Sequence, residues 1–423
     1  MMMAGLQSAK ADLFSYVKAP DPAFHWQLVS KSKTLNGTIY HLSMVSQVWE
    51  GITWKHHVEL FYPKKVTFPG KATLLITGGN PDASDLMLGE MVANATGVPF
   101  AVLFEIPNQP LFDGRSEDAL IAYTFVQYLH TGDANWPLLF PMVKSAVKAM
   151  DMLQAFSRTD LHQPIKSFIV TGASKRGWTT WLTGAADPAR VIGIAPMVIE
   201  MLNLPAQMKH QLATWGSYSQ EIEDYTKAGI QQQLGTPRGQ VLAKMVDPYT
   251  YRDRLTMPKL IINGTNDPYW PQDAMNLYWN GLKGPKWVLY DPNSGHGLSD
   301  KTRVLDTMVA FIKTVAAGKE LPSLQWKYEV RNKKVTLLLK SSQKASGARL
   351  WLAKSDTLDF RPSHWSSTPM TKDGGEYEGT ASVPQEGNIA VFGELTYKLN
   401  GHPYTLSTEI KIAPDVREQV GNR

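Results

Sequence analysis

Three residues whose side chains could together perform nucleophilic catalysis, Ser174, Asp267 and His296, are widely spaced along the chain. Each follows a short apolar stretch of the length of a buried β-strand. A serine hydroxyl is a poor nucleophile until a base removes its proton, and a histidine held by a carboxylate can act as that base near neutral pH. Because all three follow predicted strands, they are expected to meet at one edge of a parallel sheet. The sequence therefore predicts a Ser-His-Asp triad.

Ser174 lies at the apex of a predicted strand, turn and helix. The strand 165–170 ends near Gly172, whose missing Cβ permits a tight turn, and small and apolar residues follow at helical spacing over 178–186. This is the setting of a nucleophile elbow, and the order nucleophile, acid, histidine is that of α/β-hydrolases. The elbow departs from the usual G-x-S-x-G because Arg176 occupies the place of the second glycine. A helix N-cap, a position that favours serine, is the alternative for Ser174 taken alone.

Two backbone segments are expected to supply the N–H groups of an oxyanion hole. The helix that begins after Ser174 points its positive end at the serine, so the N–H of Lys175 is one candidate donor. The apolar run 72–77 ends in glycines, and in α/β-hydrolases the loop after this strand gives the second N–H. Gly79 and Asn80 are therefore expected to contribute, with a simple glycine turn as the alternative.

The acid of the triad has two candidates. Asp267 follows the stretch 259–263 by a short glycine turn and is the preferred residue. Glu200 falls at the end of the preceding predicted strand, where some hydrolases of this fold carry their acid. Aspartate in a turn is often an ordinary turn former, so Asp267 is preferred only because of its joint placement with Ser174 and His296.

The elements that must position these residues begin with an antiparallel lead-in over 24–62, with hairpin turns at Asn36-Gly37 and Glu50-Gly51. Strands and helices then alternate, which predicts a parallel sheet built of right-handed crossovers. The expected strands are 72–77, 98–105, 165–170, 191–199, 259–263 and 286–290, and the expected helices are 116–130, 141–156, 178–186, 271–282 and 301–315.

The alternation stops between about 200 and 258, where tyrosine- and glutamine-rich helical sequence covers 206–216 and 218–234. We expect a lid insertion over the carboxyl edge of the sheet, within an α/β-hydrolase catalytic domain of residues 1–320. An extra helical layer without a gating role is the alternative.

Residues 321–423 are expected to form an immunoglobulin-like β-sandwich, because six or seven short alternating segments are separated there by turns. That accessory domain could bind a polymer or pack against the catalytic domain. Its expected strands are 324–330, 334–340, 348–354, 376–383, 389–399 and 404–412.

The composition of the 423 residues excludes several classes of function. The chain has no cysteine, so disulfides, thiolate catalysis and cysteine-ligated metals are excluded, and we expect neither a metal nor a cofactor. The formal charge of +5 is small and scattered, which argues against a nucleic-acid surface. No stretch reaches the roughly 18 apolar residues of a membrane span. Thirteen tryptophans suit either an aromatic-lined pocket or, for most of them, core packing.

With these motifs in view, the chain resembles the PhoPQ-activated pathogenicity-related protein family of α/β-hydrolases over nearly its whole length. The resemblance is carried by residues 77–80, 172–178, 195–203, 263–267 and 292–296. It implies a serine hydrolase that is exported, secreted or periplasmic, and associated with virulence. Residues 1–10 lack the apolar core of a signal peptide, so export is implied by the resemblance alone.

The elbow is also similar to that of carbohydrate esterases, in which a basic side chain after the serine helps to hold the oxyanion. Lys175 occupies that place. We therefore expect hydrolysis of a small-molecule or carbohydrate ester through an acyl-enzyme. A peptidase with the same triad, and a secreted signalling or binding protein with a vestigial site, are the alternatives.

Overall fold

The computed structural model describes residues 12–414, so the N-terminal segment considered for export and the last nine residues of the expected accessory domain lie outside the described residues. Within 12–414, fourteen strands form one mixed sheet and four form a second, antiparallel sheet. The order of the large sheet is β1-β2-β3-β5-β4-β6-β7-β8-β9-β17-β16-β12-β13, with β18 beside β16, and the small sheet has the order β10-β11-β15-β14.

The first nine strands all belong to the large sheet. They are β1 (His25–Lys33), β2 (Gly37–Trp49), β3 (Ile52–Pro63), β4 (Lys71–Ile76), β5 (Phe100–Leu103), β6 (Ser167–Ala173), β7 (Val191–Met197), β8 (Lys259–Gly264) and β9 (Lys286–Asp291). The later strands are β10 (Leu324–Arg331), β11 (Lys334–Ser341), β12 (Gly347–Ser355), β13 (Ser366–Pro369), β14 (Thr371–Asp373), β15 (Glu376–Ser382), β16 (Asn388–Leu399), β17 (His402–Ser407) and β18 (Lys411–Ala413).

The α-helices are α1 (Leu13–Lys18), α2 (Ala83–Thr96), α3 (Glu117–Thr131), α4 (Leu139–Thr159), α5 (Lys175–Ala186), α6 (Leu204–Trp215), α7 (Glu223–Lys227), α8 (Ile230–Gln233), α9 (Pro237–Val246) and α10 (Lys301–Ala316). Four short 3₁₀ segments are η1 (Gln220–Ile222), η2 (Pro248–Arg254), η3 (Ala274–Leu277) and η4 (Trp279–Gly281).

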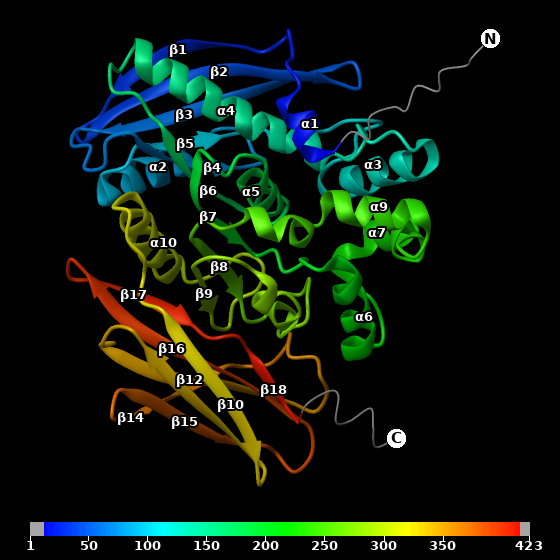
Figure 1. Cartoon of the computed structure of the whole chain (residues 1–423), viewed down its shortest axis with the longest axis vertical. Coiled ribbons are helices and arrows are strands. Elements are labelled where there is room, and N and C mark those ends of the chain that lie inside the picture. The colour runs from blue at the N-terminus through cyan, green and yellow to red at the C-terminus, as the bar shows by residue number, and fades with distance from the viewer. Residues whose placement is uncertain (1–11, 415–423) are drawn as a thin grey trace.

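The parallel strands β4 to β9 are buried on both faces, as their continuous apolar runs predict. In β6, Phe168 and Val170 belong to a core shared with α4 and α5, whereas Ile169 belongs to a second core shared with α2 and α10. Successive side chains of a strand point to opposite faces, so a run of apolar residues fills both cores. Figure 1 shows the helices of the two layers on either side of the sheet.

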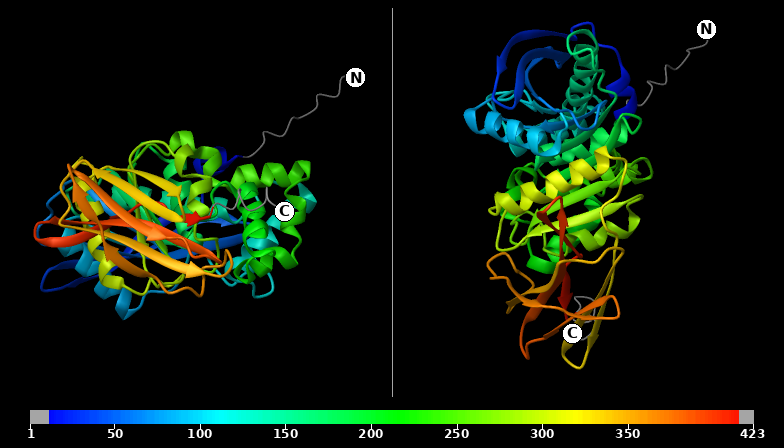
Figure 2. Two further views of the ribbon diagram at one scale, coloured as in Figure 1. Left: turned by 90° about the horizontal axis from the view of Figure 1, so that it is seen from below. Right: turned by 90° about the vertical axis from the view of Figure 1, so that its left-hand side faces the viewer.

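The antiparallel lead-in is confirmed. Strands β1, β2 and β3 pair in sequence, and the β2–β3 turn places Glu50 at φ 50° and Gly51 at φ 74°. Two successive residues with positive φ match the twist of a tight hairpin. These strands form one end of the elongated molecule, opposite the C-terminal strands (Figure 2).

The insertion after β7 is helical, as expected, and α6, α7 and α9 gather beside α3 on one side of the molecule (Figure 1). The helical sequence expected over 218–234 is confirmed, in three short pieces. The segment is divided into η1, α7 and α8, because Gly229 adopts the left-handed conformation (φ 70°) and ends the helical path. A further helix, α9, follows Thr236, whose side chain accepts a hydrogen bond from the N–H of Gly239.

Two expectations about helices need correction. The helix expected over 271–282 is wrong, because this segment contains only η3 and η4, which are separated by Tyr278 with a non-helical φ of −138°. Helix α2, which was not expected, begins after Asp82. The side chain of Asp82 accepts hydrogen bonds from the N–H groups of Ser84 and Asp85, as an N-cap does.

Residues 324–413 are antiparallel strands divided between two sheets. The face of β16 packs on the small sheet, since a Cβ at Gly393 would approach the side chains of Leu337 and Leu339. Strand β17 pairs with β9 at Ser407 and Val288, so the large sheet runs from the parallel part into these C-terminal strands. The strand expected over 404–412 is in fact two strands, β17 and β18. Among the described residues, no helix has the length and apolarity needed to cross a membrane.

Candidate active site

Ser174 stands between β6 and α5 in a strained backbone conformation, with φ 55° and ψ −125°. A positive φ at a residue other than glycine costs of order 1–3 kcal/mol and persists only where the surroundings enforce it. The side chain makes no capping hydrogen bond to α5, although Ser174 occupies the N-cap position. The geometry is therefore that of an elbow that presents its hydroxyl, and the N-cap alternative is not realised.

Glycines on both sides of Ser174 allow the turn to close. A Cβ at Gly172 would lie 2.7 Å from the carbonyl oxygen of Arg176, and a Cβ at Gly177 would lie 2.8 Å from both Ile199 Cγ2 and the carbonyl oxygen of Met197. Real Cβ atoms do not make contacts as short as these distances. The close packing that needs glycine thus falls at Gly177, one residue later than in the usual motif.

Arg176, which replaces the second glycine of the motif, binds the elbow to the loop after β5 and to the start of α3. Its Nε donates to the carbonyl of Ile106 (2.5 Å), and its two terminal nitrogens donate to the Glu117 carboxylate (2.6 and 2.7 Å). Burial opposes ionisation of Glu117, but the hydrogen bonds and charge of Arg176 outweigh it and lower the pKa of Glu117 to about 2. The guanidinium also lies so close to Gly78 that a Cβ there would be 1.8 Å from Arg176 Nη2.

His296 and Asp267 are in direct contact. The distance between His296 Nδ1 and Asp267 Oδ2 is 2.8 Å, and the other carboxylate oxygen accepts from the N–H of Tyr269 (3.0 Å). The Tyr269 ring stacks on the imidazole with 4.2 Å between ring centres. These contacts orient the imidazole, and its Nε2 is buried without a hydrogen-bond partner. Ser174 and His296 line the same pocket, although the described contacts include no hydrogen bond between them.

Glu200 makes different contacts. Its carboxylate accepts hydrogen bonds from the Tyr278 hydroxyl (2.6 Å) and from Asn263 Nδ2 (2.5 Å). Burial raises the pKa of Glu200 to about 7, even though both hydrogen bonds favour the ionised form. The structure therefore brings Asp267 to His296 and engages Glu200 elsewhere.

The side chain of Lys175 is held by carboxylates. Its Nζ lies 2.7 Å from Asp118 Oδ2 and 3.5 Å from Glu117 Oε2, which neutralise the ammonium charge. Only the backbone N–H of Lys175 then remains for the oxyanion. A Cβ at Gly79 would meet no atom within 4 Å, so the expected oxyanion loop with Gly79 and Asn80 borders open space.

A pocket of about 70 Å³ opens beside these residues, between the elbow, α3 and the helices inserted after β7. The sequence did not single out Asp118, Tyr225 and Tyr269, all of which line it. Tyr225 donates to Asp118 (2.9 Å). Asp118 falls in the first turn of the helix expected over 116–130, and the position of Tyr269 two residues after Asp267 was the available signal. In the part of the chain described, no group of three or more histidine and carboxylate side chains could hold a metal ion.

Comparisons with known proteins agree with this architecture. The sequence matches the PhoPQ-activated pathogenicity-related protein family over residues 13–361. It is 35% identical over 345 residues to autocrine proliferation repressor protein A of Dictyostelium discoideum, covering 76% of this chain and 69% of that protein.

Two solved structures share the fold. Acetyl xylan esterase 1 from Thermoanaerobacterium sp. JW/SL YS485 aligns with a TM-score of 0.51 at 16% identity, over 72% of this chain and 91% of that one. The acetyl xylan esterase from Paenibacillus sp. R4 has the same TM-score at 15% identity, over 70% and 90% of the two chains. The fold is thus one that carboxylic ester hydrolases use. Together with the family match, these findings show that the chain belongs to the PhoPQ-activated pathogenicity-related protein family, as its motifs predicted.

Proposed function

We propose that the protein is a serine carboxylic ester hydrolase that works through an acyl-enzyme. Ser174 attacks the ester carbonyl, His296 accepts the serine proton and then delivers it to the leaving alcohol, and Asp267 orients His296. The N–H groups of Lys175 and the Gly79-Asn80 loop stabilise the oxyanion. Water, activated by the same histidine, releases the acid. The observation that carries the proposal is the 2.8 Å contact between His296 and Asp267 at a pocket that also contains the strained Ser174.

The test is labelling with a serine-reactive fluorophosphonate and turnover of p-nitrophenyl acetate. Ser174→Ala should abolish labelling, and Ser174→Ala and His296→Ala should each lower kcat on the order of 10⁴-fold or more, because the triad acts as a unit. Equal turnover by these variants and the wild type would remove Ser174 from catalysis.

The acid is tested by a matched pair of amide substitutions. Asp267→Asn should lower kcat on the order of 10⁴-fold, because it destroys the orientation of the imidazole. Glu200→Gln should leave kcat within about twofold of the wild type, since Glu200 does not contact His296. The reverse pattern would assign the acid to Glu200.

A secreted signalling protein with a vestigial site is the second candidate, favoured by the name of the Dictyostelium relative, an autocrine proliferation repressor. Failure of the folded wild type to react with the fluorophosphonate would favour it. A peptidase using the same triad would cleave aminoacyl anilides at rates comparable with esters.

For the finer architecture, we propose a lid over 200–258 and an immunoglobulin-like β-sandwich after 321. We propose export on the basis of the family alone.

A further inference from the structure

We infer, resting on the proposed ester hydrolase, that one of the two groups of the substrate ester is an uncharged hydrocarbon chain or ring. The group that binds beneath the lid is therefore neither a sugar nor a charged acid. The inference depends on the side chains that wall the pocket beside Ser174 and on how its polar groups are already paired.

Apolar side chains enclose the pocket from several elements. Helix α3, the elbow helix α5 and the lid segments each contribute to the wall. Representative side chains are Phe125, Trp178, Met208, Ile222, Ile230 and Leu234. A hydrocarbon group would bury its surface here without desolvating any polar atom, and each buried methylene improves binding by about fourfold.

Most polar side chains of the wall, apart from Ser174 and His296, already have hydrogen-bond or ion-pair partners. Asp118 holds both Lys175 Nζ (2.7 Å) and the hydroxyl of Tyr225 (2.9 Å). Gln231 Nε2 donates to Thr226 (3.0 Å), and Gln231 Oε1 is a single uncharged acceptor. A substrate carboxylate would lack an unpaired cation in this wall. Sugar hydroxyls would find the unpaired Gln231 Oε1 but would lose most of their other hydrogen bonds to water without replacement.

The test compares p-nitrophenyl esters from acetate to octanoate, and acetate esters of methanol to hexanol. We expect kcat/KM to rise about threefold to fourfold per methylene in one of the two series until the pocket is full. Met208→Trp should remove that gain, because the larger ring fills the lid side of the pocket. Leu212→Trp is the matched control, since Leu212 is 43% exposed on the same helix.

Flat or falling kcat/KM in both series, with acetylated xylose the preferred substrate, would overturn the inference while leaving the hydrolase intact. Absence of turnover on every ester, with no fluorophosphonate labelling, would instead overturn the proposed function. A gain that Met208→Trp does not alter would place the hydrocarbon group outside this pocket and would also contradict the inference.

A second observation concerns the clamp loop, which we define as residues 356–365 between β12 and β13. We propose that the clamp loop positions the two loops that carry Asp267 and His296, so that the C-terminal strands contribute to catalytic geometry. This proposal also rests on the proposed hydrolase, but it depends on contacts outside the substrate pocket.

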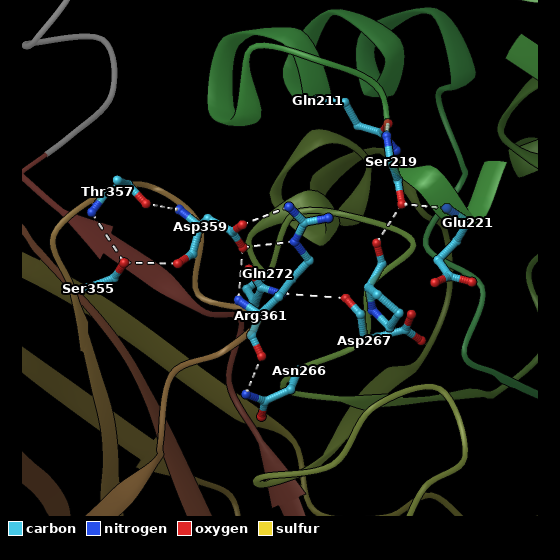
Figure 3. A network of polar contacts seen from close by, with 11 residues as sticks. Gln211, Ser219, Glu221, Asn266, Asp267, Gln272, Ser355, Thr357, Asp359 and Arg361 are labelled. Carbon is cyan, nitrogen blue, oxygen red and sulfur yellow. Dashed lines mark hydrogen bonds and ion pairs between the residues drawn. The ribbon is translucent and has the colours of Figure 1, made fainter. Parts of the chain in front are cut away.

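The clamp loop holds the acid loop through Asn266, the neighbour of Asp267 (Figure 3). Asn266 Nδ2 donates to the carbonyls of Arg361 (3.0 Å) and Ser363 (2.7 Å). Its Oδ1 accepts from the hydroxyl of Thr265 (2.7 Å). The Asn266 amide group therefore has partners on both its nitrogen and its oxygen, which fixes the backbone next to the acid.

The histidine loop is held in the same way by Asn293, three residues before His296. Asn293 Nδ2 donates to the carbonyl of Trp365 (2.9 Å), and the N–H of Trp365 donates to Asn293 Oδ1 (2.7 Å). The two catalytic loops are also tied together, because the N–H of Asn293 donates to Thr265 Oγ1 (2.9 Å). One loop from the C-terminal strands thus braces both members of the Asp267–His296 pair.

The clamp loop has its own anchors. Phe360 and Trp365 are buried, and the Arg361 guanidinium is bound by the Asp359 carboxylate at 2.8 and 2.6 Å. The same guanidinium lies 4.0 Å above the Trp215 ring at the end of lid helix α6. An anchored loop can impose a position on its partners, as a flexible loop could not.

The test substitutes the two asparagines in the full-length protein. Asn266→Ala and Asn293→Ala should each lower kcat about tenfold or more with KM within about twofold, because binding is kept and geometry is lost. The downfield proton resonance of His296 Nδ1–H, assigned by its absence in His296→Ala, should broaden or shift. Asn276→Ala is the matched control, since Asn276 Nδ2 also bonds a carbonyl of the C-terminal strands, that of Ile410 (3.0 Å), but lies outside both catalytic loops.

A lower melting temperature with unchanged kcat and an unchanged resonance would reduce the clamp loop to a stabilising contact and overturn the proposal. If an alanine variant does not fold, Asn293→Ser, which shortens the side chain but keeps it polar, supplies the same kcat and resonance measurements. Loss of activity in Asn276→Ala equal to that in Asn293→Ala would likewise contradict a specific positioning role.

Discussion

At the scale of single residues, two carboxylates, the partly exposed Glu117 and the buried Glu200, have opposite electrostatic settings. Glu117 is held ionised by Arg176, with a pKa near 2, whereas burial raises the pKa of Glu200 to about 7. A carboxylate that orients a catalytic histidine must stay charged at the working pH. Asp267, beside the histidine and bonded by a backbone N–H, occupies the setting that suits this role better than that of Glu200.

Glu200 should make stability depend on pH. Its folded-state pKa is raised from 4.5 to about 7, so its stabilising effect is complete below pH 4.5 and is lost as pH rises through 7. In the wild type, the titration of Glu200 should lower the free energy of unfolding by about 3 kcal/mol between pH 4.5 and pH 8. Glu200→Gln should remove this decrease. Urea denaturation of both proteins across this range measures the difference.

At the scale of elements, close packing between neighbouring segments constrains the conformation of the elbow. Strand β6, helix α5 and the end of β7 approach so closely that Gly172 and Gly177 leave no room for a Cβ. Arg176 in turn packs against Gly78, which couples the elbow to the expected oxyanion loop. The departure from G-x-S-x-G therefore moves one close contact by a residue and adds an ion pair with Glu117.

A pair of glycine substitutions tests this packing. Gly177→Ala should lower the free energy of unfolding by about 1–3 kcal/mol, because its methyl group would overlap Ile199 and the carbonyl of Met197. Gly79→Ala should leave the melting temperature nearly unchanged, since its methyl group would enter open space. Equal melting temperatures for the two variants would show that the elbow can relax.

At the scale of the whole molecule, most of the C-terminal strands belong to the same sheet as the parallel strands. Besides the β9–β17 pairing, Arg303 of α10 forms an ion pair with Glu394 of β16, whose side chain is buried. A shared sheet, a buried ion pair and the clamp loop together predict that the two parts unfold as one unit.

Glu394→Ala tests that prediction. Removing the carboxylate leaves the Arg303 charge partly buried without its closest partner, which should cost about 3–5 kcal/mol. Ester hydrolysis and circular dichroism should lose their signals at the same, lower urea concentration. Glu329→Ala is the control, because Glu329 pairs with Lys327 on the exposed small sheet and should shift neither midpoint appreciably. Separate midpoints for the two signals would mean that the two parts unfold independently.

The sequence by itself determined the order of the parallel strands along the chain, the elbow around Ser174 and the family. These features depend on local patterns: apolar runs of strand length, glycines at a tight turn, and short motifs. The helix expected over 271–282 failed at Tyr278, whose φ of −138° separates η3 from η4. The Tyr278 hydroxyl is bonded to Glu200, a distant contact that local periodicity does not register.

Only the tertiary structure decided which carboxylate lies beside His296, where the charge of Lys175 is neutralised, and what borders the catalytic loops. Glu200 and Asp267 both follow strands, and their different environments arise from Tyr278, Asn263 and distant backbone groups. The contact of Asn266 with Arg361 joins residues 95 apart in the chain. No local pattern encodes such a contact, because it depends on how β17 and β9 bring the C-terminal strands to the edge of the sheet.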